Sequence, residues 1–243
     1  MATALILSAG SDIARSIAMA LAKDGYDLQL AGRNMDQLLR EAKDLEIRSG
    51  KTVSVYEWDA LNFDSHPGFY ASLKQRPDLV VCVTGYLGDQ KIAEDNRAEM
   101  LKILNTNYTG CVSILEEAAR EMEQKKSGGI IGISSVAGER GRASNYFYGS
   151  AKAGFTAYLS GLRNRLFFSG VHVLTVKPGF VKTKMTEGLP LNPKLTATPD
   201  QVAADILKAW KKKKNSIFTL WFWKWIMAII TFIPEGKFKS MKL

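Results

Sequence analysis

The chain of 243 residues contains few of the side chains that bind metals or form disulfides. It has two cysteines and two histidines, and none is spaced like a CxxC pair or a metal-ligand set. This scarcity excludes a zinc site and a histidine-based nucleophile–base pair, and no metal is expected. Cys82 and Cys111 lie in apolar surroundings, so we expect buried thiols in a reducing cytoplasm.

Long hydrophobic runs are also scarce. The only stretch near the roughly 20 residues of a membrane span extends from Ile217 to Ile233, and residues 216–220 are expected to form a final strand. The remainder, Trp221–Ile233, is too short to cross a bilayer. The first residues have neither the basic region nor the apolar length of a signal peptide, so a cytoplasmic location is expected.

Acidic residues are nearly absent from the end of the chain. From Lys211 onward, eight lysines accompany a single acid, Glu235. The rest of the protein is therefore close to neutral, which argues against a nucleic-acid partner. The C-terminal extension, residues 221–243, is expected to form an aromatic and basic helix. It either contacts the cytoplasmic face of a membrane as a peripheral element or packs on protein, within an oligomer or over the substrate site.

Short apolar runs alternate with longer segments of helical periodicity along the chain. This alternation predicts one domain over residues 1–243, an α/β doubly wound Rossmann fold whose seven-stranded, mostly parallel sheet has helices on both faces. Strands are expected at 4–7, 27–31, 52–57, 79–83, 129–134, 172–177 and 216–220. Helices are expected at 12–24, 35–48, 69–74, 94–126 (with a break), 147–168 and, behind a capping box at Thr198, 199–212.

Tyr148 and Lys152 are four residues apart in an expected helix, so their side chains share one face. A cation beside a phenol favours the deprotonated phenol and so eases proton exchange near neutral pH. Ser135 offers a hydroxyl for the same substrate oxygen. The trio suits proton transfer to or from a carbonyl or alcohol oxygen. Taken alone, the Tyr–Lys pair is more typical of a solvated helix surface, and its place in the rest of the chain reverses that interpretation.

The first expected strand leads into a helix through small residues, from Ser8 to Ala14. Such a turn lets a pyrophosphate approach backbone N–H groups at the helix N-terminus. Asp12 in this turn either contacts the cofactor or caps the helix. Arg33, after the second strand, is either a surface residue or a ligand of a ribose 2′-phosphate, which favours NADP(H) over NAD(H).

Two further positions complete the expected cofactor site. Asp59, after the third strand, is suited to accept a hydrogen bond from the adenine amino group, and Gly85, after the fourth, lets the chain pass close to the cofactor. The expected cofactor contacts in this half of the chain are Ser8, Gly10, Ser11, Asp12, Ile13, Arg33, Asn34, Asp59, Ala60 and Gly85.

An ordered set of motifs now makes the chain similar to the short-chain dehydrogenase/reductase family over essentially its whole length. The set comprises the first βα turn, Asp59, Asn107, Ser135, Tyr148 with Lys152, and Pro178-Gly179 with Thr183. The resemblance implies that Tyr148 is the general acid/base and that Ser135 positions the substrate oxygen. It implies that Lys152 holds the nicotinamide ribose and that Asn107 holds a water in a proton relay. It also implies nicotinamide contacts from Pro178, Gly179, the backbone of Val181 and the hydroxyl of Thr183.

The departures from the family pattern lie in the cofactor half. The family usually has glycines at the positions of Ser8, Asp12 and Ala14. Its usual Asn-Asn-Ala-Gly stretch is replaced here by Cys-Val-Thr-Gly at residues 82–85. This eroded loop motivates an alternative from another class, a non-catalytic dinucleotide-binding protein. The intact Ser135 and Tyr148 argue against it and favour an NADPH-dependent carbonyl reductase.

A closer resemblance concerns the segment 134–150, which is similar to reductases of decaprenylphosphoryl-keto-ribose. It implies a keto-sugar linked to a polyprenyl phosphate as substrate; a 3-oxoacyl, steroid-like or other apolar ketone is the alternative. Arg140 and Arg142 precede Tyr148 and either bind the substrate phosphate or make surface or subunit contacts. A substrate lid is expected at about 184–200, and the family resemblance implies a homodimer or homotetramer.

Overall fold

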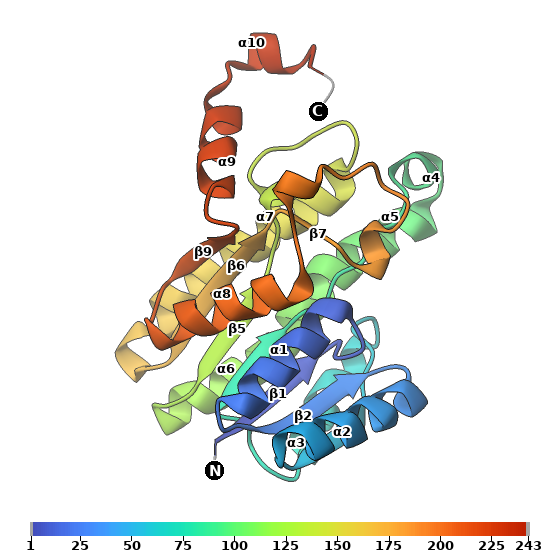
Figure 1. Cartoon of the computed structure of the whole chain (residues 1–243). Helices are drawn as coiled ribbons and strands as arrows, with labels where there is room; N and C mark the ends of the chain where they lie inside the picture. The colour runs from blue at the N-terminus through green and yellow to red at the C-terminus, as the bar shows by residue number, and fades with distance from the viewer. Residues whose placement is uncertain (1, 242–243) are drawn as a thin grey trace.

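A seven-stranded sheet forms the centre of the molecule in the computed structural model, which describes residues 2–241 (Figure 1). Its strands are β1 (Thr3–Leu7), β2 (Asp27–Gly32), β3 (Val53–Glu57), β4 (Leu79–Cys82), β5 (Gly129–Ile133), β6 (His172–Pro178) and β9 (Ser216–Thr219). They lie in the order β3-β2-β1-β4-β5-β6-β9, and every pair is parallel. The predicted doubly wound fold is confirmed. The strand order reverses between β1 and β4, the place where such sheets open a ligand crevice.

Helices cover both faces of this sheet because its strands are apolar on both sides. One face packs against α1 (Asp12–Lys23), α2 (Met35–Ser49) and α8 (Pro199–Lys211), and the other against α3 (His66–Ser72), α6 (Gly110–Lys125) and α7 (Tyr146–Leu166). Within β1, Ile6 belongs to the first core, whereas Leu5 and Leu7 belong to the second. Thr198 forms the predicted capping box with Gln201 at the start of α8.

The long helix expected at 94–126 is broken, as predicted. It consists of α4 (Gln90–Asp95), α5 (Arg97–Leu104), a π-helical turn (Asn105–Thr109) and α6. Asn96 lies between α4 and α5 in an extended conformation, and its side-chain oxygen accepts hydrogen bonds from the N–H groups of Ala98 and Glu99. This cap starts a new helix and explains the break.

A short strand pair holds the segment after β6. β7 (Phe180–Val181) pairs with β8 (Thr196–Ala197). The residues between them, 182–195, are called the substrate loop below; they contain short 3₁₀ turns at Lys184–Thr186 and Pro193–Leu195. The expected lid at 184–200 overlaps this loop, although its last two residues belong to α8.

The C-terminal extension forms α9 (Trp223–Phe232) and α10 (Glu235–Phe238), which project beyond the carboxyl end of β9 (Figure 1). Residues 242–243 of the expected extension lie outside the described residues. None of the helices in the described part of the chain is long and apolar enough to span a membrane. The lysine run 211–214 lies before β9, at the opposite end of that strand from α9, so the strand separates this run from the tryptophans of the extension.

Candidate active site

Tyr148 and Lys152 lie on the same face of α7. The Lys152 Nζ is 5.8 Å from the centroid of the Tyr148 ring. The lysine is 2% exposed, and its ammonium donates hydrogen bonds to the carbonyls of Thr84 (3.0 Å) and Ile133 (3.1 Å). These carbonyls lie at the carboxyl ends of β4 and β5, so the sheet itself fixes the cation beside the half-buried tyrosine.

Ser135 follows β5 and begins a 3₁₀ turn over Val136–Gly138. Its hydroxyl oxygen accepts a hydrogen bond from the Ala137 N–H (3.1 Å). The turn packs tightly on α7: a Cβ at Gly138 would lie 2.7 Å from the backbone nitrogen of Ala153. The glycine therefore allows the serine-bearing loop to approach the helix that carries Tyr148.

Asn107 is fully buried in the π-helical turn, and its amide binds the backbone of its neighbours. Its Nδ2 donates to the carbonyls of Tyr86 (2.6 Å) and Ile103 (2.8 Å), and its Oδ1 accepts from the Tyr86 N–H (3.1 Å). Asn107 thus fixes the chain just after Gly85. The role that the family resemblance implies, holding a relay water, stays a prediction.

Gly85 marks the point where the expected catalytic residues converge. A Cβ at this glycine would lie 3.6 Å from both the Lys152 Nζ and the Asn107 Oδ1, and 3.7 Å from the Met185 Cε. The side chains of α7, the π-helical turn and the substrate loop therefore meet at the carboxyl end of β4.

A cleft of 840 Å³ extends from this point across the ends of β1, β2 and β3. It brings together eight of the expected cofactor residues: Ser8, Gly10, Ser11, Arg33, Asn34, Asp59, Ala60 and Gly85. Tyr86, Trp58, Lys102 and Thr106 also line it and were not anticipated. Ile13, Pro178 and Val181 are instead buried or packed on the core, and Gly179 contacts α9, so these four are not among the residues that line the cleft.

The donors around this cleft fit an anionic dinucleotide. Arg33 is exposed and makes no hydrogen bond or ion pair with residues 2–241, so its guanidinium is available to a phosphate. Ser11, rather than Asp12, caps α1: its hydroxyl accepts from the Ala14 N–H (3.3 Å). Ser8 adopts a left-handed conformation (φ 59°) where the family usually has glycine, and its hydroxyl is 3.0 Å from that of Thr84.

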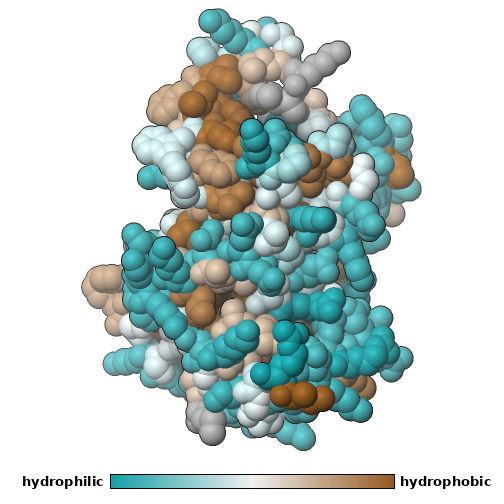
Figure 2. All heavy atoms as spheres, viewed as in Figure 1, coloured by the Kyte–Doolittle hydropathy of each residue, from teal (hydrophilic) through white to brown (hydrophobic). Residues whose placement is uncertain are grey.

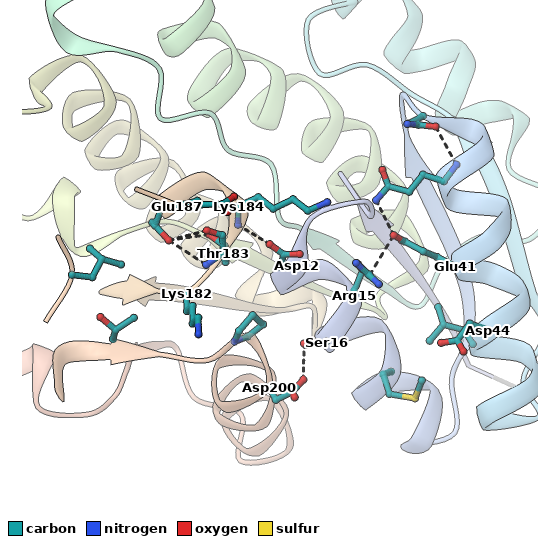
Figure 3. A pocket seen from close by; sticks show the side chains of 18 of the residues that line it. Asp12, Arg15, Ser16, Glu41, Asp44, Lys182, Thr183, Lys184, Glu187 and Asp200 are labelled. Atoms are coloured by element: carbon teal, nitrogen blue, oxygen red, sulfur yellow. Dashed lines mark hydrogen bonds and ion pairs between the residues drawn. The ribbon is translucent and has the colours of Figure 1, made fainter. Parts of the chain in front are cut away.

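Asp12 ties the substrate loop to the first helix. Its carboxylate accepts a hydrogen bond from the Lys184 N–H (2.9 Å), so the alternative that it caps α1 is wrong. The contact lies in a second cleft of 1430 Å³ between α1, α2 and the substrate loop (Figure 3). In the same cleft, Ser16 donates to Asp200 (2.7 Å) at the start of α8. Thr183, an expected nicotinamide contact, also lines it, with its hydroxyl 3.4 Å from that of Thr186.

His66 contacts the backbone of Asp59. It is fully buried; its Nε2 lies 3.0 Å from the Asp59 carbonyl and its Nδ1 2.9 Å from the Ser113 hydroxyl. The Asp59 carboxylate in turn accepts from the Leu61 N–H (3.0 Å). Because Ser113 is 47 residues away from His66, no local pattern indicated the contact.

Arg140 holds the C-terminal helices, which corrects its assignment to the substrate phosphate. Its guanidinium donates to the carbonyls of Ile230 (2.7 Å) and Ile233 (2.6 Å), pairs with Glu235 (2.8 Å) and stacks on Phe238 at 3.7 Å. The alternative was a surface or subunit contact, and the contacts observed instead join two parts of the same chain.

Arg142 is different because its guanidinium lacks a partner of opposite charge. Its NH2 group points at the Met227 sulfur (3.6 Å), and its Nε is buried without a hydrogen bond. No ion pair joins Arg142 to a carboxylate within residues 2–241. Burial lowers the pKa of Arg142 from its ordinary value because desolvation penalises the charge.

α9 forms a wall beside these residues. Trp223 is buried, donates its indole N–H to the Leu195 carbonyl (3.2 Å) and packs edge-to-face on Phe180. A Cβ at Gly179 would lie 2.0 Å from the Trp223 Nε1. With Met227, Trp223 also packs on Val136, the neighbour of Ser135. The helix thus contacts β7, the last residue of the substrate loop and the loop that carries the serine.

Comparison with known proteins agrees with this arrangement. Residues 2–194 match the family model for short chain dehydrogenases. The chain belongs to the short-chain dehydrogenase/reductase family. As a member of this family it is an NAD(P)-dependent oxidoreductase.

The relatives extend over nearly the whole chain. An uncharacterized oxidoreductase of Mycobacterium tuberculosis is 35% identical over 235 residues, which cover 96% of this chain and 92% of the relative. One from Streptomyces coelicolor is 31% identical, with coverage of 98% and 94%. The structure of a short-chain dehydrogenase from Sphingobium yanoikuyae, in complex with NADPH, has a TM-score of 0.83 at 20% identity and coverage of 97% and 98%. At that identity the likeness shows the shared fold.

Proposed function

We propose that the chain is an NADPH-dependent carbonyl reductase in which Tyr148 gives a proton to the substrate oxygen. The observation that carries this proposal is the fixed position of the Lys152 ammonium, held by two strand carbonyls 5.8 Å from the Tyr148 ring centroid. A cation in that place favours the phenolate left after proton transfer.

The proposed reaction adds two hydrogens to a ketone. A bound NADPH would supply hydride to the carbonyl carbon and leave as NADP⁺. Tyr148 donates the proton to the oxygen, and the Ser135 hydroxyl hydrogen-bonds the same oxygen. Lys152 stabilises the phenolate until a proton from solvent restores the phenol.

Substitution of Tyr148 by phenylalanine tests the mechanism because the ring remains and the proton is lost. We expect ketone-dependent NADPH oxidation by Tyr148→Phe to fall at least about a hundredfold, with NADPH binding, followed by nicotinamide fluorescence, unchanged. Tyr146→Phe, an exposed tyrosine in the first turn of the same helix, is the matched control and should keep full activity. Undiminished turnover by Tyr148→Phe would overturn the proposal.

Preference for NADP(H) over NAD(H) is proposed from Arg33, which follows β2 and has no hydrogen-bond or ion-pair partner within residues 2–241. We expect Arg33→Glu to weaken NADPH binding by about tenfold or more and NADH binding far less, since only NADPH carries the 2′-phosphate. Equal losses for both nucleotides would contradict this preference.

The proposed substrate is a keto-sugar linked to a polyprenyl phosphate. Its support is Arg142, a half-buried cation without an acidic partner in the loop between Ser135 and Tyr148. We expect Arg142→Met to raise KM for a phosphate-bearing ketone at least about tenfold while leaving KM for a neutral ketone unchanged, and Arg142→Lys to retain part of the discrimination. Equal KM changes for both ketones would exclude a phosphate role.

The alternative substrate is a 3-oxoacyl or other apolar ketone. A relative from Nostoc named a ketoacyl reductase is 28% identical and covers 88% of this chain and 77% of its own length. Turnover of a 3-oxoacyl thioester in preference to a phosphate-bearing keto-sugar would favour this alternative.

We further propose that the protein works in the cytoplasm as a homodimer or homotetramer, with peripheral membrane contact through the C-terminal extension. Two buried thiols, Cys82 and Cys111, fit a reducing compartment. Size-exclusion chromatography with light scattering reports the assembly directly, and a monomer at micromolar concentration would contradict it.

A further inference from the structure

Helix α9 has two faces in opposite environments. Its inner face carries Trp223 and Met227, which are buried against the catalytic loops. Its outer face and the turn before it carry an exposed stripe, defined here as Trp221 (73% exposed) of the turn and Trp225 (59%), Ile229 (69%) and Phe232 (86%) of the helix. Within α9, spacings of four and three residues place Trp225, Ile229 and Phe232 in one row along the helix, and Trp221 lies in the turn just before it. Apolar residues accordingly gather over α9 in the space-filling view (Figure 2).

The charges around this stripe are positive. Lys224, Lys237 and Lys239 are exposed on α9 and α10, whereas the only acid there, Glu235, is paired with Arg140 (2.8 Å). Lys224 lies over the Trp225 ring at 5.6 Å. Tryptophans and lysines beside an apolar row are characteristic of elements that lie in the interface of an anionic bilayer. The ten residues of α9 span only about 15 Å, so the helix would lie on the surface.

The inner face connects α9 to the substrate loop. Trp223 contacts the strand that precedes the loop, through Phe180 of β7, and the last residue of the loop, through the Leu195 carbonyl. The loop carries Met185, whose Cε approaches the Gly85 position beside Lys152. The segment 180–195 therefore contacts α9 through Phe180 and Leu195 and reaches the position beside Lys152 through Met185.

The turn before α9 concentrates strain at the base of the helix. Leu220 has a left-handed backbone (φ 54°), which costs a residue with a side chain, and it packs against both the main core and the α9 cluster. A strained residue at this position is suited to absorb a small change in the angle of α9.

We propose that the outer stripe of α9 binds an anionic lipid surface and that this contact, transmitted through Trp223, orders the substrate loop over the active site. The catalytic part of this proposal rests on the proposed reductase function; lipid binding and ordering of the loop do not. The partner is a phospholipid bilayer, and a second copy of the chain on the same stripe is the competing occupant.

Lipid binding is tested by sedimentation of the full chain with vesicles of phosphatidylcholine alone or mixed with phosphatidylglycerol. We expect capture only by the anionic vesicles, and capture at least about tenfold weaker for Phe232→Ser, because an aromatic side chain no longer enters the interface. Phe168→Ser is the matched control: Phe168 is 93% exposed at the end of α7, away from α9, and its loss should not change binding. Equal capture of wild type and Phe232→Ser would overturn the proposal.

Transmission to the loop is tested without any ketone. The substrate loop contains exposed lysines at positions 182, 184 and 194, so trypsin reports its mobility. We expect anionic vesicles to slow cleavage within the loop at least about threefold in wild type. In Trp223→Phe, which keeps an aromatic ring but loses the indole N–H and its hydrogen bond to Leu195, vesicles should still bind and protection should be lost. Vesicle binding that leaves cleavage of the wild type unchanged would refute the coupling.

The remaining tests of the proposal measure catalysis and the oligomeric state. With NADPH and a water-soluble ketone, the ordered loop should raise kcat/KM when anionic vesicles are present. If kcat/KM does not rise although the vesicles still protect the loop from trypsin, the result counts against the proposed reductase function and not against the lipid contact. Conversion of an oligomer to monomer by Phe232→Ser, without vesicle capture of the wild type, would identify a second copy as the occupant and overturn the proposal.

Discussion

Substitution of Gly179 by alanine tests whether α9 is built into the active site. An alanine Cβ would lie 2.0 Å from the Trp223 Nε1, 2.1 Å from its Cε2 and 2.6 Å from its Cδ1. Ordinary carbon contacts are about 3.5 Å, so the indole must retreat by roughly 1.5 Å. Because the ring is buried, its displacement stretches the 3.2 Å hydrogen bond to the Leu195 carbonyl beyond bonding distance.

The expected cost has two parts. Overpacking costs about 1–3 kcal/mol, and an orphaned buried N–H costs about 1–3 kcal/mol, so the free energy of unfolding should fall by about 2–6 kcal/mol. A chain of 243 residues has an unfolding entropy near 0.5 kcal/mol per kelvin. The melting temperature of Gly179→Ala should therefore drop by about 4–12 °C, and the activity should drop with it because the substrate loop loses its anchor.

Calorimetry of the full chain measures this effect. Gly161→Ala is the matched control: this exposed glycine of α7 has nothing within 4 Å of an added Cβ, so the change should stabilise by up to about 1 kcal/mol. Adding Trp223→Ala to Gly179→Ala removes the ring that is displaced. We expect the double variant to be at least about 2 kcal/mol more stable than the sum of the single effects. Strict additivity, or an unchanged melting temperature for Gly179→Ala, would refute the packing argument.

Two further predictions concern stability. Burial, followed by the charge of Lys213, lowers the pKa of His172 below its ordinary 6.5. The unfolded chain then binds more protons than the folded one, so the free energy of unfolding falls as the pH falls through about 6.5. His172→Gln should reduce this dependence of stability on pH, measured by urea titrations at about pH 7.5 and 5.5. An identical dependence in the variant and the wild type would contradict the prediction. Lys126 ends α6 in a left-handed conformation (φ 53°), so Lys126→Gly should stabilise by about 0.5–1 kcal/mol in the same assay, and a loss of stability would contradict the strain.

Local sequence patterns predicted much of the fold. Buried parallel strands are short apolar runs, which is why the expected strand at Gly129–Ser134 matches β5 within one residue. Thr198 and Gln201 are only three residues apart, so their capping box could be read directly from the chain. The alternative that Asp12 caps α1 is wrong because Ser11, one residue earlier, can accept the same hydrogen bond, and only the backbone angles decide which residue is the cap.

The site residues could be predicted where the family resemblance covers them. Contacts that depend on long-range packing were missed. Gly85, Asn107 and Lys152 converge as expected. By contrast, Arg140 meets Ile230 across 90 residues, and Asp12 meets Lys184 across 172. Neither contact has a local signal, because a charged side chain in a loop looks the same whether it binds a ligand or a distant carbonyl.

The π-helical turn at Asn105–Thr109 has a consequence for how the chain tolerates changes in length. A regular helix rotates by about 100° per residue, and a π turn accommodates one extra residue relative to an α turn. Removing a single residue between α5 and α6 would restore the ordinary helix and swing Asn107 away from Tyr86. A deletion there should remove the contact between Asn107 and the chain after Gly85 while leaving the helix intact. The segment 187–192 is not helical, so a deletion in it would not rotate later residues about a helix axis.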